Sequence, residues 1–254
     1  MFTAFRDTYL ITGRNLRHAI RTPQFILVEV LIQPIIFVLL FAFVFGGAIH
    51  VPGMKYIDFL LPGILVQTAA FGSLNTAIAL TEDLKNGLMD RFWWLPMARI
   101  AVILGRIATD AVLAAVGVVV MLVVGALIGF RFHGSVPAAV AAIGVVLLFG
   151  FAFTWLAALL GVAFRKPEMV QAAGFMAIFP LTFASSAFVP VSTMPGWLRA
   201  FAQHTPMTAT VDAVRQLVGG QPVGNELGLA LAWIAAIILV SGSAASLLYL
   251  RMSR

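Results

Sequence analysis

The chain has 254 residues, of which 61% are hydrophobic and only 10% are charged, and its mean hydropathy is +1.03. A soluble globular domain carries about a quarter charged residues and disorder needs low hydrophobicity, so disorder is excluded and a soluble enzyme nearly so. The chain has no cysteine, which excludes disulfides, zinc–thiolate sites and thiol catalysis. This composition is typical of a polytopic membrane protein.

The first 24 residues predict an amphipathic helix. Apolar side chains recur at helical spacing, while arginines take another face: Phe2, Phe5, Tyr9, Leu16 and Ile20 against Arg14, Arg17 and Arg21. Such a helix lies in the cytosolic membrane interface, as an elbow before the first span. The alternative is a positively charged anchor that only fixes the topology.

Six apolar runs are each long enough to cross a hydrocarbon layer, which takes about 20 helical residues. Their continuous apolar character argues against barrel strands, in which apolar and polar residues alternate. We therefore expect an all-α integral membrane fold with six transmembrane helices. The predicted spans cover about residues 25–48, 56–80, 100–128, 137–164, 169–188 and 227–250.

The basic residues fix the orientation of these spans. With both termini in the cytosol, 12 of the 16 Lys and Arg residues lie on the cytosolic side, as the positive-inside rule requires. The basic residues thus anchor the topology and form no contiguous patch, which excludes nucleic acid as a partner.

A charged segment, Thr81–Arg99, separates the second and third predicted spans. Thr81 can cap a short helix whose first turn carries Glu82 and Asp83, which suits the helix dipole. Apolar residues stripe one side of it and Pro96 ends it. A short cytosolic helix of this kind suits docking of a soluble partner, and the alternative is a solvated connector.

A second unusual segment, residues 189–220, lies on the outer side and is moderately apolar. Prolines divide it into two short helices, near 195–203 and 208–218, each too short to span a membrane. We expect a re-entrant hairpin covered by protein, because exposed backbone is not tolerated in lipid. The alternative is an ordinary surface loop.

The order of these pieces resembles the permeases of type-2 ABC exporters, most closely those of the daunorubicin-resistance type. The charged segment resembles the family's coupling helix through Glu82, Gly87, Leu88, Arg91, Pro96 and Arg99, although Asp90 stands where the family usually has Glu. Residues 56–63 resemble the entry to its second span. The outer segment resembles its extracellular hairpin, through Pro190, Pro195, Trp197, Pro206, Asp212 and Arg215.

The resemblance implies a transport subunit without an ATPase site of its own, and the chain has no G-x-x-x-x-G-K-[ST] motif. ATP and Mg would be bound by two separate cytosolic ATP-binding cassette subunits beneath two permease copies, identical or related, in a bacterial plasma membrane. This chain itself would bind no cofactor or metal. The implied ATPase-coupling residues are Glu82, Asp83, Lys85, Gly87, Leu88, Asp90 and Arg91.

The resemblance also implies a translocation path along the first, second and fifth spans. Phenylalanines share one face at i, i+4 and i+8 in both the first and fifth spans, which suits a planar drug or a lipid as cargo. The alternative is contact with lipid or helix packing. The predicted path residues are Phe37, Phe41, Phe45, Gln67, Phe71, Phe175, Phe179 and Phe183.

Three other functions compete with drug or lipid export. An ABC exporter of polysaccharide or lipo-oligosaccharide is the nearest, but the chain has only three tyrosines and five tryptophans for stacking on sugars. An ion-coupled secondary carrier needs carboxylates near the middle of the membrane, where we expect none. An intramembrane protease needs a buried catalytic histidine, and all four histidines lie at span ends or in loops.

Overall fold

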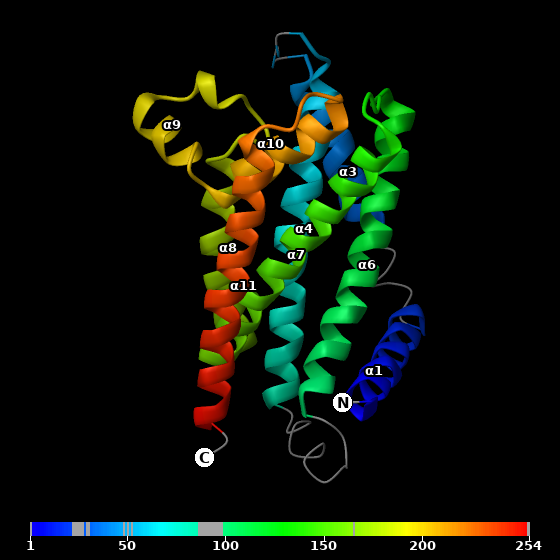
Figure 1. Cartoon of the computed structure of the whole chain (residues 1–254), viewed down its shortest axis with the longest axis vertical. Coiled ribbons are helices and arrows are strands. Elements are labelled where there is room, and N and C mark those ends of the chain that lie inside the picture. Colours follow the sequence, from blue (N-terminus) through cyan, green and yellow to red (C-terminus); the bar gives the residue numbers. More distant parts are fainter. Residues whose placement is uncertain are drawn as a thin grey trace.

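The computed structural model describes residues 2–21, 28, 31–47, 49, 51, 53–85, 99–164 and 166–252. All regular elements in these ranges are helices, and most run along the long axis of the molecule (Figure 1). Both termini lie at one end, with the ends of α4 and α7, and the short helices α9 and α10 lie at the other. We call these the lower and the upper end.

The amphipathic N-terminal segment forms α1 (Phe2–Arg21), which packs against the lower half of α6 (Arg99–Ile128). Ile11 is buried there, and a Cβ added to Gly105 would come within 2.6 Å of the Ile11 side chain. Glycine at 105 therefore lets α1 approach α6 closely, as small residues do between membrane helices. Tyr9 and Leu10 are exposed on another face of α1.

Among the residues that the structure describes, four helices are long and apolar enough to cross a membrane, as in a multi-pass membrane protein. They are α4 (Tyr56–Lys85), α6, α7 (Val136–Phe164) and α11 (Asn225–Met252). Their apolar stretches agree with four of the six predicted spans: Tyr56–Ala79, Ala108–Ile128, Val136–Phe164 and Asn225–Ala245.

The structure describes only part of the first predicted span. Helix α3 (Gln33–Leu40) begins with Pro34 in its first turn and continues as the π-helix η2 (Phe41–Phe45), followed by a turn at Gly46. Proline suits this position because the first turn has no intrahelical partner for its missing N–H. Residues 22–27, 29, 30 and 48 of the predicted elbow and span lie outside the described ranges.

The fifth predicted span ends early. Helix α8 (Pro167–Phe183) has 17 residues and stops five residues before the predicted end at 188. The backbone of the turn that follows bonds to other elements: the Ser186 N–H donates to Thr208 Oγ1 at 3.1 Å, and the Phe188 carbonyl accepts from the Tyr56 hydroxyl at 3.3 Å. These tertiary bonds replace the helical ones that the apolar sequence would otherwise support.

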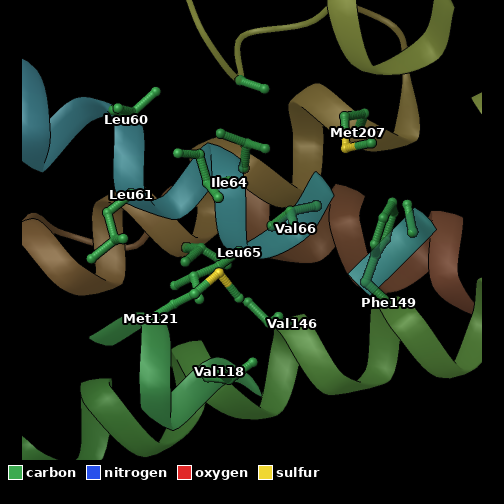
Figure 2. Close-up of a cluster of buried hydrophobic side chains, with 14 of the residues drawn as sticks. Leu60, Leu61, Ile64, Leu65, Val66, Val118, Met121, Val146, Phe149 and Met207 are labelled. Atoms are coloured by element: carbon green, nitrogen blue, oxygen red, sulfur yellow. The ribbon is translucent and has the colours of Figure 1, made fainter. Parts of the chain in front are cut away.

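Helix α4 forms the centre of the bundle and packs against α6, α7, α8 and α10. Figure 2 shows its side chains meeting those of α6, α7 and α10 in one core, with Leu60, Ile64, Met121, Phe149 and Met207 almost fully buried. The upper half of α4 approaches the turn after α8 so closely that a Cβ on Gly63 would lie 2.1 Å from the Ala187 carbonyl oxygen.

Two short helices lie where the prolines delimit the outer segment. After the 3₁₀ turn η3 (Val191–Thr193), α9 (Gly196–Ala202) projects at the upper end (Figure 1). Helix α10 (Pro206–Gly219) is capped by Thr205, whose hydroxyl accepts from the Thr208 N–H, and ends at Gly220 with φ +67°. A left-handed residue at this position commonly ends a helix. Helix α10 packs on α4, α7 and α11.

Candidate functional site

The predicted coupling segment is only partly described. Thr81 does not cap a new helix: it lies inside α4, where its hydroxyl donates to the Ala77 carbonyl at 2.7 Å. Helix α4 continues to Lys85 and carries Glu82 exposed at its lower end. The side chains of Asp83 and Lys85 are not described, and Gly87, Leu88, Asp90 and Arg91 lie outside the described residues.

Six of the seven predicted path phenylalanines form two rows of neighbouring rings. On α3 and η2, the ring centroids of Phe37 and Phe41 lie 5.4 Å apart, and those of Phe41 and Phe45 lie 5.2 Å apart. On α8, the centroids of Phe175 and Phe179 lie 5.1 Å apart and those of Phe179 and Phe183 lie 4.4 Å apart. Spacing of four residues thus brings each row onto one helix face.

Phe188, which the sequence did not single out, joins the two rows. Its ring centroid lies 4.4 Å from that of Phe41 and 5.1 Å from that of Phe183. At the other end, the Phe175 centroid lies 5.9 Å from that of Phe71 on α4. The rings form a continuous surface that we call the aromatic band: Phe45, Phe41, Phe37, Phe188, Phe183, Phe179, Phe175 and Phe71.

A cleft of about 430 Å³ lies beside the aromatic band, between α3, α4 and α8. Its size falls in the usual range for small-molecule sites, about 300–1,000 Å³. We call it the aromatic cleft. Six of the eight predicted path residues line it, whereas Phe41 and Phe45 only continue the band: Phe37, Gln67, Phe71, Phe175, Phe179 and Phe183.

The polar groups of the aromatic cleft are uncharged. No described residue that lines the cleft is charged. Besides Thr68, the lining contains four carboxamide side chains: Gln33, Gln67, Asn75 and Gln171. Aromatic and aliphatic walls with a few polar groups are typical of sites for small organic ligands.

A smaller chamber of about 130 Å³ adjoins the cleft, between α4, α6 and α7. Asp110 lines it and accepts a hydrogen bond of 2.6 Å from the Thr76 hydroxyl. Asp110 lies near the beginning of the apolar stretch Ala108–Ile128, so this carboxyl is nearer the end of that span than its middle. The sequence feature that points to this chamber is Asp110, an acidic residue within an apolar run.

The structure brings together two of the predicted hairpin residues. Arg215 donates to Asp212 Oδ1 at 2.6 Å, and the same oxygen accepts from the Ser186 hydroxyl at 2.8 Å. Arg215 also donates to the carbonyl oxygens of Ser186 at 2.9 Å and of Phe59 on α4 at 3.0 Å. Burial lowers the pKa of the Arg215 guanidinium to about 10, which leaves it charged at neutral pH and in need of these partners.

The remaining hairpin residues lie apart from this cluster. Pro190 and Pro195 directly precede η3 and α9, and Pro206 is the first residue of α10. Trp197 lies on α9 and is 76% exposed. In the part of the chain that the structure describes, no three His, Asp or Glu residues lie together as metal ligands would.

Comparison with known families decides the identity of this helical bundle. The family model described as ABC-2 type transporter matches residues 6–218. The chain belongs to the ABC-2 type transporter family.

Named relatives of this ABC-2 permease extend over most of its length. The daunorubicin resistance ABC transporter permease protein DrrB1 of Streptomyces coeruleorubidus is 34% identical over 214 residues, which cover 84% of this chain and 76% of that protein. The probable doxorubicin resistance ABC transporter permease protein DrrC of Mycobacterium tuberculosis is 28% identical over 251 residues, covering 97% and 89%. DrrB of the same organism is 25% identical over 201 residues, covering 77% and 70%.

The family assignment establishes the coarse role of the chain. Permeases of this family are membrane components of ABC transporters and are not themselves the ATPases, and membership implies association with ATP-binding cassette subunits. The similarity to permeases of drug-resistance transporters supports the role of permease subunit of an ABC exporter.

Proposed function

We propose that this ABC-2 permease moves a hydrophobic, drug-like or lipid cargo out across the bacterial plasma membrane through the aromatic cleft. The observation that carries the proposal is the cleft itself: a cavity between α3, α4 and α8 with five phenylalanine rings in its lining and no charge among its described lining residues. A flat apolar molecule buries its faces against such rings with favourable offset or edge contacts.

The names of the relatives agree with this cargo class. The relatives in Streptomyces coeruleorubidus and Mycobacterium tuberculosis are named for resistance to daunorubicin and doxorubicin. Export of a polysaccharide is less well supported, because the aromatic residues that line the cleft are all phenylalanines, whose rings lack the polar group of tyrosine and tryptophan.

The proposal includes a six-span topology with cytosolic termini. α3 with η2 and the 17-residue α8 supply the first and fifth spans, in addition to the four long apolar helices. α1 is the interfacial elbow before a transmembrane domain of residues 25–254, and the upper end carries the extracellular hairpin. The exposed Tyr9 and Leu10 on α1 support its contact with lipid headgroups.

Energy would come from ATP and Mg bound to two separate cytosolic subunits beneath two permease copies. The lower end of α4, where Glu82 is exposed, continues into the charged segment that we assign to the ATPase contact. Residues 82–91 would sit in a groove of each ATPase and transmit its movement to α4, the central helix of the bundle. Since α4 also lines the aromatic cleft, that movement would reach the cargo directly.

Transport by the assembled complex tests the proposal. The chain, co-expressed with candidate ATP-binding cassette subunits, is reconstituted into inside-out vesicles, and ATP-dependent uptake of a planar fluorescent dye is measured. We expect uptake to fall about tenfold in Phe179→Ala, because this change removes one aromatic ring from the lining of the cleft. Phe43→Ala is the matched control, because Phe43 is 71% exposed on η2 and does not line the cleft. Equal uptake by both variants would refute the cleft as the path.

A further inference from the structure

Gln67 differs from the other carboxamide residues of the aromatic cleft. The side chains of Gln33, Asn75 and Gln171 are exposed, whereas Gln67 is only 4% exposed. Its Oε1 is buried and has no hydrogen-bond partner. In the described part of the chain, the one other buried side-chain N or O atom in this state is Trp155 Nε1, which does not line the cleft.

No neighbouring group donates a hydrogen bond to Gln67 Oε1. The adjacent hydroxyl, that of Thr68, donates to the sulfur of Met121 at 3.8 Å. Gln33, Asn75 and Gln171 line the same cleft and carry amide donors, but none of them bonds to Gln67 Oε1. A buried carbonyl without a donor is unfavourable, and such groups in native proteins usually have a partner. Because Gln67 lines the cleft and its Oε1 is itself buried, a donor in the cleft reaches this oxygen when the amide turns toward the cavity.

We infer that Gln67 selects cargo that carries a hydrogen-bond donor, such as a hydroxyl on a flat aromatic ring system. The rings of the cargo lie in the aromatic cleft, and the hydroxyl donates to Gln67 Oε1. This inference rests on the proposed function and adds a specificity rule to it. A site that is built to bond a hydroxyl discriminates against an analogue without it, because its own polar group is then left unpaired.

Three matched probes test the inference: 1-hydroxypyrene, 1-methoxypyrene and pyrene. The first can donate a hydrogen bond, the second can only accept one, and the third does neither. Binding of each probe to the full-length chain in lipid nanodiscs is measured by fluorescence, and the signal of empty nanodiscs is subtracted. We expect 1-hydroxypyrene to bind about tenfold more tightly than 1-methoxypyrene, which corresponds to ~1.4 kcal/mol.

A variant isolates the side chain responsible. Gln67→Met keeps the length of the side chain and removes its carbonyl, so we expect the preference for 1-hydroxypyrene to fall below about twofold. Gln203→Met, the same replacement at an exposed position after α9, is expected to keep the tenfold preference. The comparison of the three probes on the unaltered chain stands even where Gln67→Met fails to fold.

The outcomes separate this inference from the proposed function. Equal binding of 1-hydroxypyrene and 1-methoxypyrene, tighter binding of 1-methoxypyrene, or a preference that survives in Gln67→Met would overturn the role of Gln67 and leave the aromatic cleft as a cargo site. Absence of specific binding by all three probes would overturn the cleft as a cargo site, and the inference with it.

Discussion

The guanidinium of Arg215 lies over the ring of Phe59, 3.8 Å from its centroid, and donates to the carbonyl oxygen of the same residue through both Nε and Nη2. One side chain of α10 thus holds both the backbone and the ring of the upper part of α4. Because Asp212 and Ser186 also bind Arg215, the cluster connects α10, α4 and the turn after α8. Because these groups satisfy its hydrogen-bonding capacity, the Arg215 charge is stable in a partly buried position at the upper end.

Replacement of Arg215 by methionine is expected to lower the melting temperature of the purified protein by about 5–10 °C, because it breaks a partly buried ion pair and removes bonds that join three elements. Thermal unfolding in detergent is the measurement. Arg199→Met is the matched control: within the described residues, the Arg199 side chain bonds to the local carbonyls of Ser192 and Met194, so a change below about 2 °C is expected. Equal shifts in the two variants would contradict the special role of Arg215.

Gly63→Ala is expected to destabilise the protein by a similar amount, about 5 °C or more in melting temperature. The added Cβ would lie 2.1 Å from the Ala187 carbonyl oxygen, and the two backbones would have to separate. Gly144→Ala in α7 is the comparison, because nothing lies within 4 Å of its added Cβ. Alanine there should leave stability unchanged or raise it slightly, and a loss at Gly144 as large as at Gly63 would show that contact distance is not the cause.

Charge reversal at Glu82 tests the proposed coupling segment. In Glu82→Lys we expect ATP-dependent export to fall about tenfold and less ATPase to co-purify with the permease. The reversed charge at the lower end of α4 would repel the ATPase surface that the carboxylate of Glu82 attracts. Glu168→Lys makes the same change at an exposed position in the first turn of α8 and should retain export. Full export by Glu82→Lys, with normal co-purification, would place the coupling contact elsewhere.

The absence of native cysteine allows a direct measurement of topology, since each introduced thiol is the only one in the chain. Ser192→Cys, in η3 at the upper end, should react with a membrane-impermeant maleimide added to intact cells. Ser253→Cys, next to the C-terminus, should react only after the cells are permeabilised. The reverse pattern would invert the proposed orientation.

The sequence was sufficient for those features that depend on one helix at a time. Apolar length identified the four long spans, and spacing by four residues placed Phe37, Phe41 and Phe45 on one helix face and Phe175, Phe179 and Phe183 on another. The sequence could not show that Phe188 joins the two rows, because that contact depends on where α8 ends and how the next turn is held.

The local sequence pattern predicted two helix ends incorrectly. The sequence predicts that residues 184–188 extend the fifth span, but α8 ends at Phe183, and the backbone of these residues bonds instead to Thr208, Arg215 and Tyr56. Thr81 precedes two acidic residues, as an N-cap does, but it lies buried within α4 and its hydroxyl bonds the Ala77 carbonyl. In both places tertiary packing outweighs local preference.

The turn after α8 takes part in two structures that otherwise look separate. Phe188 completes the aromatic band between Phe41 and Phe183, and Ser186, two residues earlier, is held by Arg215 and Thr208 of α10. A movement that draws α10 away from α4 therefore also disturbs the rings above the cleft, and a ring displaced there strains the bonds to α10. Residues 186–188 therefore couple the aromatic band mechanically to helix α10.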